Sequence, residues 1–121
     1  MRLKIYYLDD EDDLLEVFAD TFSNADNTIT TFSDPALALE AIRSSPPDLL
    51  FIDYRLPNTT GDEFAQKIDA SIPKILMTGD THLTLESKFE TVLEKPYSVS
   101  EVRKWIAQYL EKLRLSPSKN E

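Results

Sequence analysis

Four short apolar stretches of the chain each end in a residue type that can bind a metal ion or a phosphoryl group. Asp9 and Asp10 follow the first stretch, Asp53 ends a continuous apolar run, and Thr78 and Lys95 follow two later stretches. Three carboxylates that meet repel one another unless a divalent cation binds them or some of them take up protons. Oxygen ligands suit Mg²⁺, and a hydroxyl and an ammonium can pair with phosphoryl oxygens. The candidate chemistry is therefore phosphoryl transfer with Mg²⁺, and Asp53 is the candidate nucleophile.

Apolar periodicity predicts the elements that must position these residues. The predicted strands cover residues 3–8, 28–32, 48–53, 74–78 and 91–93. The predicted helices cover residues 12–23, 35–43, 61–70, 83–89 and 98–113. Alternating strands and helices indicate a parallel sheet with helices on both faces. Because the carboxyl ends of parallel strands lie at one edge, the polar strand-end residues are expected to converge there.

Two helix starts carry recognisable capping residues. Asp34 precedes Pro35, and Pro at the first helical position loses no hydrogen bond. Ser98 and Glu101 have the spacing of a capping box. Both patterns fix where a predicted helix begins.

The composition narrows the functional classes. The net charge is −9, which opposes binding to the phosphate backbone of nucleic acid. The chain has no Cys, so it offers no thiolate metal site or cysteine nucleophile. No apolar run is long enough to span a bilayer, and the acidic residues 9–13 are untypical of a signal peptide. We therefore expect a cytoplasmic protein without direct nucleic-acid binding or membrane insertion.

The polar strand ends resemble the receiver domain of two-component response regulators, and the resemblance covers nearly the whole chain. The matching residues are Asp9-Asp10, Asp53 to Pro57 with Gly61, Thr78-Gly79 and Lys95-Pro96-Tyr97. The resemblance implies a flavodoxin-like, doubly wound α/β fold. Its five-stranded parallel sheet has the order 2-1-3-4-5, with the site between strands one and three. The receiver domain is expected over residues 1–115, followed by a polar tail over residues 116–121.

The resemblance also implies a role for each site residue. Asp53 would be phosphorylated, and Thr78 and Lys95 would bind the phosphoryl group. The implied Mg²⁺ site contains Asp10 as a direct ligand, Asp9 through water or as support, Asp53, and the backbone carbonyl of Arg55. The implied donor is a histidine kinase or phosphotransfer protein. Output to an unknown protein would occur through protein–protein contacts, and the domain would act as a phosphoacceptor rather than an enzyme with external turnover.

This sequence departs from the family at two places. Receivers usually carry an aromatic switch residue three positions before the Lys, where this chain has Val92. Lys95 also stands only 17 positions after Thr78, so the fourth helix is expected to be short, irregular or missing. A relay by rotation of an aromatic ring is therefore not expected here.

Arg55 and Asp80 stand two positions after Asp53 and Thr78. Family positions of this kind flank the site and tune dephosphorylation. We hypothesise that the two residues pair across the mouth of the site and limit the access of water. The alternative is that both are solvated surface charges.

Two other functions fit parts of the pattern. A receiver-like interaction module that is not phosphorylated would agree with Val92 and the short segment that precedes it. A Mg²⁺-dependent phosphohydrolase would also use an aspartyl phosphate. Such hydrolases of the haloacid-dehalogenase type carry the nucleophile on their first strand with a second Asp two residues later, where this chain has Arg55 after Asp53.

Overall fold

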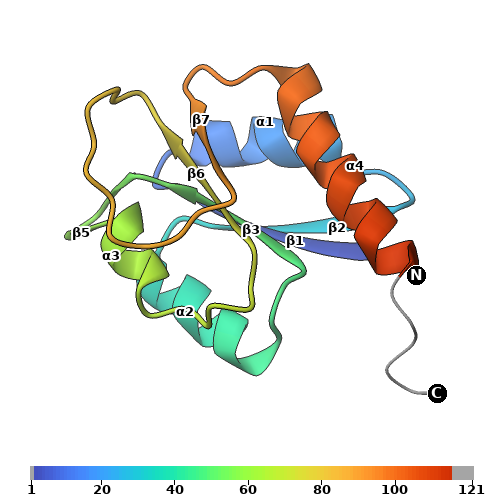
Figure 1. The fold of residues 1–121 in the computed structure, drawn as a ribbon, viewed down its shortest axis with the longest axis horizontal. Coiled ribbons are helices and arrows are strands. Elements are labelled where there is room, and N and C mark those ends of the chain that lie inside the picture. Colours follow the sequence, from blue (N-terminus) through green and yellow to red (C-terminus); the bar gives the residue numbers. More distant parts are fainter. Residues whose placement is uncertain (1, 116–121) are drawn as a thin grey trace.

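Five parallel strands form the central sheet of the protein in the order β2-β1-β3-β6-β7 (Figure 1). The structure is a computed structural model and describes residues 2–115. The strands of this sheet are β1 (Leu3–Leu8), β2 (Asn27–Phe32), β3 (Leu49–Asp53), β6 (Lys74–Thr78) and β7 (Thr91–Glu94). The helices are α1 (Asp12–Phe22), α2 (Pro35–Ser44), α3 (Gly61–Ala65) and α4 (Val99–Leu115). The strand order confirms the predicted flavodoxin-like sheet.

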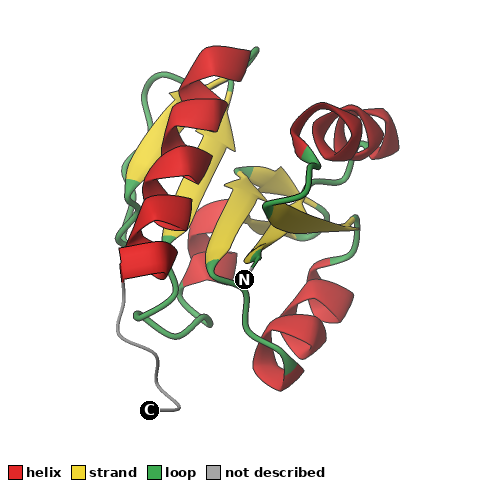
Figure 2. Ribbon diagram, turned by 90° about the vertical axis from the view of Figure 1, so that its right-hand side faces the viewer, coloured by secondary structure: helices red, strands yellow, loops and turns green. Residues whose placement is uncertain are grey.

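Helices cover both faces of the sheet. α1 and α4 lie on one face, and α2 and α3 lie on the other (Figures 1 and 2). Successive side chains of a strand point to opposite faces, so β1 contributes to both cores. Tyr7 packs in the core under α1 and α4, whereas Tyr6 packs in the core beside α2 and α3.

The sheet register brings the carboxyl ends of the strands together. β1 pairs with β3 through Leu8 and Ile52, and β3 pairs with β6 through Asp53 and Met77. Thr78 at the end of β6 pairs with Glu94, one residue before Lys95. One edge of the sheet therefore carries the predicted site residues.

Both predicted capping residues are confirmed. The Asp34 side chain accepts a hydrogen bond of 2.9 Å from the Ala36 amide at the start of α2. Ser98 Oγ accepts a hydrogen bond of 3.3 Å from the Glu101 amide at the start of α4. These caps satisfy amides that the first turn of a helix leaves without a partner.

The predicted helix over residues 83–89 is wrong. The segment 79–90, which the structure describes throughout, contains no helix and runs as an extended loop beside α3 (Figure 1). Its amides at Glu86 and Ser87 each donate a hydrogen bond of 2.8 Å to the Asp62 carboxylate. Ser87 Oγ also donates to the Asp62 carbonyl at 2.9 Å. Because α3 supplies these acceptors, the loop satisfies its backbone without forming a helix.

Helix α3 is shorter than the predicted range 61–70. After Ala65 the amides of Lys67 and Ile68 bond to carbonyls three residues earlier, which tightens the chain into turns. The predicted loop before α3 also contains a small antiparallel hairpin of β4 (Arg55–Leu56) and β5 (Thr59–Thr60). Asn58 at its turn has a φ of 60°, a left-handed conformation that Asn tolerates.

The predicted tail over residues 116–121 lies outside the described residues. Among residues 2–115, none of the helices combines the length and the apolar character that crossing a membrane requires.

Candidate functional site

The predicted strand-end residues surround a hollow of about 380 Å³ at the carboxyl edge of the sheet. Its lining residues are Asp10, Glu11, Asp53, Arg55, Thr78, Gly79, Asp80 and Lys95. They come from loops and strand ends that are distant in sequence. The hollow is polar, open to solvent at its mouth and large enough to receive a phosphoryl group.

Asp9 is fully buried beside this hollow and has three hydrogen-bond donors. Lys95 Nζ donates to Asp9 Oδ2 at 2.8 Å, and the Tyr7 hydroxyl donates to the same oxygen. The Glu11 amide donates to Asp9 Oδ1 at 3.0 Å. A buried carboxylate requires such partners because water cannot solvate it.

Lys95 also pairs with the candidate nucleophile. Its Nζ lies 2.8 Å from Asp53 Oδ1, and the Asp53 side chain is nearly buried. The pKa of Asp53 is raised to about 6 as the net result of burial, which raises it most, the Lys95 hydrogen bond, which lowers it, and the nearby charge of Asp9, which raises it. Burial alone would lower the pKa of Lys95, but its hydrogen bonds to Asp53 and Asp9 outweigh that effect and raise it. Lys95 therefore stays charged between two carboxylates.

Thr78 places a hydroxyl at the end of β6. The side chain is buried, and its Oγ1 accepts a hydrogen bond of 3.0 Å from the Asp80 amide. The Lys95 amide donates to the Thr78 carbonyl at 2.8 Å, which ties the two strand ends together. The hydroxyl proton of Thr78 can donate to a group in the hollow.

Three carboxylates could hold a metal ion at this edge. One oxygen each from Asp9, Asp10 and Asp53 lies within 4.8 Å of the other two. Asp10 is exposed, whereas the other two side chains are buried. Hard oxygen donors of this kind fit Mg²⁺, which binds through few carboxylates and keeps several waters. The Arg55 carbonyl remains a predicted further protein ligand.

Arg55 and Asp80 meet at the mouth of the hollow. Arg55 Nη2 lies 2.7 Å from Asp80 Oδ2, and the Arg55 side chain is 76% exposed. The guanidinium and the carboxylate form an ion pair, but the angles of this contact are not those of a hydrogen bond. Both residues line the hollow.

Val92 lies on β7, opposite Leu76 of β6, and is 45% exposed. Its neighbour Leu93 is buried in the core under α1 and α4, so Val92 faces the other side of the sheet. Within the described residues, no helix forms between β6 and β7. The switch position therefore carries a short, exposed side chain.

Two residues of this region were not predicted from the sequence. Tyr7 is two positions before Asp9, which follows β1, so strand alternation could have placed Tyr7 on the same face as Asp9 but could not have predicted its hydrogen bond. Asp62 is a buried carboxylate that binds the loop after β6. It had no detectable signal because its partners are backbone amides more than 20 residues away.

Solved structures of receiver domains share this fold. The signal receiver domain of an HD domain-containing protein from Pseudomonas fluorescens aligns with a TM-score of 0.86 and 26% identity, covering 96% of this chain and all of that one. The receiver domain of a putative LuxO repressor protein from Vibrio parahaemolyticus aligns with a TM-score of 0.84, 20% identity and 95% coverage of both chains.

Curated relatives match at the sequence level. The DNA-binding response regulator MtrA of Mycolicibacterium smegmatis is 28% identical over 109 residues, which cover 84% of this chain and 48% of MtrA. The DNA-binding transcriptional regulator NtrC of Escherichia coli is 29% identical over 120 residues, covering 88% of this chain and 25% of NtrC. The chain thus spans about half of one relative and a quarter of the other.

A family profile matches most of the chain as well. Residues 5–107 match the family described as "Response regulator receiver domain". The matched range includes all four polar strand ends and the pair of Asp9 and Lys95. This protein belongs to the response regulator receiver domain family.

Proposed function

We propose that this receiver domain is a Mg²⁺-dependent phosphoacceptor that takes a phosphoryl group onto Asp53 from a histidine kinase or phosphotransfer protein. The observation that carries the proposal is the position of Lys95 Nζ, which lies 2.8 Å from both Asp53 Oδ1 and Asp9 Oδ2. A charged amine held at a candidate nucleophile is placed to pair with oxygens of an incoming phosphoryl group.

The proposed step forms one bond and breaks one bond. An Asp53 carboxylate oxygen forms the new O–P bond while the P–N bond of a phosphohistidine donor breaks. The electron pair of that bond stays on the imidazole nitrogen, and Asp53 becomes an acyl phosphate. Because the pKa of Asp53 is about 6, the carboxylate is ionised and nucleophilic above that pH.

The other site residues assist this step. Thr78 donates its hydroxyl to one phosphoryl oxygen, and Lys95 moves its ammonium toward another. Asp9, Asp10, Asp53 and the Arg55 carbonyl would hold Mg²⁺. When bound, Mg²⁺ supplies positive charge that offsets the repulsion between the carboxylates and the phosphoryl oxygens. The domain acts as a phosphoacceptor and turns over only its own acyl phosphate.

Output is proposed to occur through contacts with another protein, in the cytoplasm. MtrA and NtrC are DNA-binding proteins by name, but this chain matches only part of each. The net charge of −9 supports the prediction that this domain does not itself bind nucleic acid.

Phosphorylation is tested with small donors. The protein is incubated with Mg²⁺ and acetyl phosphate, or with phosphoramidate, which has a P–N bond, and its intact mass is measured. We expect a gain of one phosphoryl group that is lost in Asp53→Asn and in EDTA. Asp20→Asn, which changes an exposed carboxylate of α1, is the matched control and should gain the group normally.

The same experiment separates two other functions. A receiver-like module that binds partners without phosphorylation is favoured by the helix-free segment 79–90 and by exposed Val92. It predicts no mass gain with either donor. Steady turnover of a generic phosphatase substrate would instead indicate a phosphohydrolase.

A further inference from the structure

Two neighbouring tyrosines of β1 direct their hydroxyls to opposite faces of the sheet. The Tyr6 hydroxyl donates to the Ser45 carbonyl at 2.7 Å, on the side of α2. The Tyr7 hydroxyl donates to Asp9 Oδ2, on the side of α1 and α4. Both side chains are buried, but only Tyr7 contacts the candidate site.

Tyr7 and Lys95 share a single acceptor. Lys95 Nζ donates to the same Asp9 Oδ2 at 2.8 Å. Asp9 has no exposed surface, so water cannot replace a donor that leaves this oxygen. An ammonium that moves away from Asp9 Oδ2 therefore leaves the Tyr7 hydroxyl as the donor to that oxygen.

The proposed function moves the Lys95 ammonium toward a phosphoryl oxygen. Lys95 Nζ bridges Asp9 and Asp53 in the structure. In the proposed step, the ammonium gives up its contact with Asp9 Oδ2 as it pairs with a phosphoryl oxygen on Asp53. The free-energy cost of this shift depends on what remains bonded to the buried Asp9 carboxylate.

We infer that Tyr7 is a positioning residue whose hydroxyl holds Asp9 Oδ2 while Lys95 transfers from Asp9 to the phosphoryl group. This inference rests on the proposed function and adds to it a residue that does not line the hollow. Tyr7 acts through Asp9 and Lys95 rather than on the phosphoryl group. Its ring packs on Phe18, with the ring centroids 4.5 Å apart, which fixes the direction of the hydroxyl.

The test compares Tyr7→Phe with Tyr6→Phe. Each variant removes one buried hydroxyl and keeps the aromatic ring, so both variants change the packing in the same way. With Mg²⁺ and acetyl phosphate, Tyr7→Phe should be phosphorylated roughly tenfold more slowly than the unsubstituted protein, and Tyr6→Phe at an unchanged rate. Equal rates for the two variants would overturn the inference.

A double-mutant cycle shows whether Tyr7 acts through Lys95. In a Lys95→Ala background the further slowing by Tyr7→Phe should fall below about twofold, since no ammonium is left to transfer. The same tenfold factor in both backgrounds would indicate a merely structural role and overturn the inference.

A spectroscopic readout does not depend on phosphorylation. The side-chain ammonium resonance of Lys95, measured by nitrogen NMR without Mg²⁺, should shift in Tyr7→Phe and stay in place in Tyr6→Phe. An unshifted resonance in Tyr7→Phe argues against the shared acceptor. If the unsubstituted protein is not phosphorylated, both the proposed function and the movement of Lys95 are refuted. Phosphorylation of this protein and of Tyr7→Phe at equal rates refutes the role of Tyr7 alone.

Discussion

The ammonium of Lys95 lies 2.8 Å from Asp53 Oδ1 and 2.8 Å from Asp9 Oδ2. Asp9 and Lys95 are 86 positions apart, so the strand ends of the sheet create this contact. One ammonium does not fully offset the burial of Asp53, whose pKa remains raised to about 6. The site therefore stores unfavourable electrostatic energy when Asp53 is ionised, and a bound cation can relieve it.

The raised pKa of Asp53 predicts an unusual dependence of stability on pH. Between the ordinary value of 3.8 and about 6, the folded protein keeps a proton that the unfolded chain has released. The free energy of unfolding should thus fall as pH rises through this window, by up to about 3 kcal/mol from this one group. Asp53→Asn lacks the titrating carboxyl, so without Mg²⁺ the variant should be the more stable protein above the window.

Urea unfolding of both proteins across the window, in EDTA, measures this effect. The difference in free energy of unfolding between the two proteins should vanish toward the acid end of the window. There the Asp53 carboxyl is protonated in both the folded and the unfolded state. Added Mg²⁺ should stabilise the unsubstituted protein above the window and leave Asp53→Asn less affected. Parallel pH profiles for the two proteins would contradict the raised pKa.

The pair of Arg55 and Asp80 is predicted to lengthen the lifetime of the acyl phosphate on Asp53. If the pair limits the access of water to Asp53, Arg55→Ala should hydrolyse its acyl phosphate up to about fivefold faster, since an exposed ion pair contributes at most about 1 kcal/mol. The loss of phosphorylated mass after removal of the donor gives the lifetime. High salt should shorten the lifetime of the unsubstituted protein toward that of the variant.

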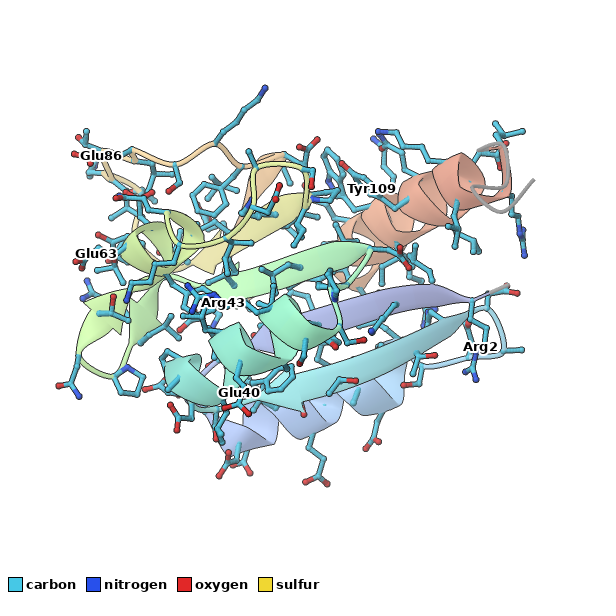
Figure 3. All side chains as sticks on the ribbon, turned by 90° about the horizontal axis from the view of Figure 1, so that it is seen from below. Arg2, Glu40, Arg43, Glu63, Glu86 and Tyr109 are labelled. Carbon is cyan, nitrogen blue, oxygen red and sulfur yellow. The ribbon has the colours of Figure 1, made fainter. Side chains whose placement is uncertain are left out.

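Three further variants test this prediction. Asp80→Asn should shorten the lifetime as Arg55→Ala does, and the double variant should add little. Arg43→Ala changes an exposed arginine of α2 that does not line the hollow, and it serves as the control (Figure 3). An unchanged lifetime in Arg55→Ala would leave Arg55 and Asp80 as surface charges.

The convergence of Asp9, Asp53, Thr78 and Lys95 could be predicted from the sequence because each follows a strand. Parallel strands place their carboxyl ends at one edge whatever the details of packing. The partner of Asp9 beneath the site could not be predicted in the same way. Strand alternation places Tyr7 on the correct face, but the hydrogen bond depends on the depth and tilt of both side chains.

The loop over residues 79–90 could not be predicted for a different reason. Leu83, Leu85 and Phe89 are apolar and close in sequence, which is compatible with a short helix. The structure satisfies the amides of Glu86 and Ser87 with Asp62 instead. Local patterns do not contain this information because the acceptor belongs to another element.

Asp62 is predicted to hold that loop in place. Figure 3 shows Glu86 of the loop on the same side of the molecule as Glu63 of α3. Asp62→Ala removes a buried acceptor of two amides, so the free energy of unfolding should fall by about 2–4 kcal/mol. Hydrogen exchange at the amides of Glu86 and Ser87 should become fast while the amides of β1 stay protected.

Glu63→Ala is the matched control for Asp62. Glu63 is the next residue of α3 and is exposed, so its removal should change the free energy of unfolding by less than about 0.5 kcal/mol. It should also leave the exchange of the loop amides unchanged. Similar exchange in both variants would mean that other contacts hold the loop.

The two glycines of the chain are predicted to respond oppositely to the same substitution. A Cβ at Gly61 would lie 2.5 Å from the Asp53 carbonyl oxygen and 2.9 Å from Leu76 Cδ1, so the backbone must shift. Gly61→Ala should lower the free energy of unfolding by about 2–3 kcal/mol. It should also slow phosphorylation by acetyl phosphate, because the shift moves the backbone of Asp53.

At Gly79 no atom lies within 4 Å of a Cβ and φ is not positive. Gly79→Ala should therefore be neutral or stabilising by up to about 1 kcal/mol, since it restricts the unfolded chain. Urea unfolding and the phosphorylation rate of both variants check the contrast, and equal losses at the two positions would show that the close approach at Gly61 has no energetic consequence.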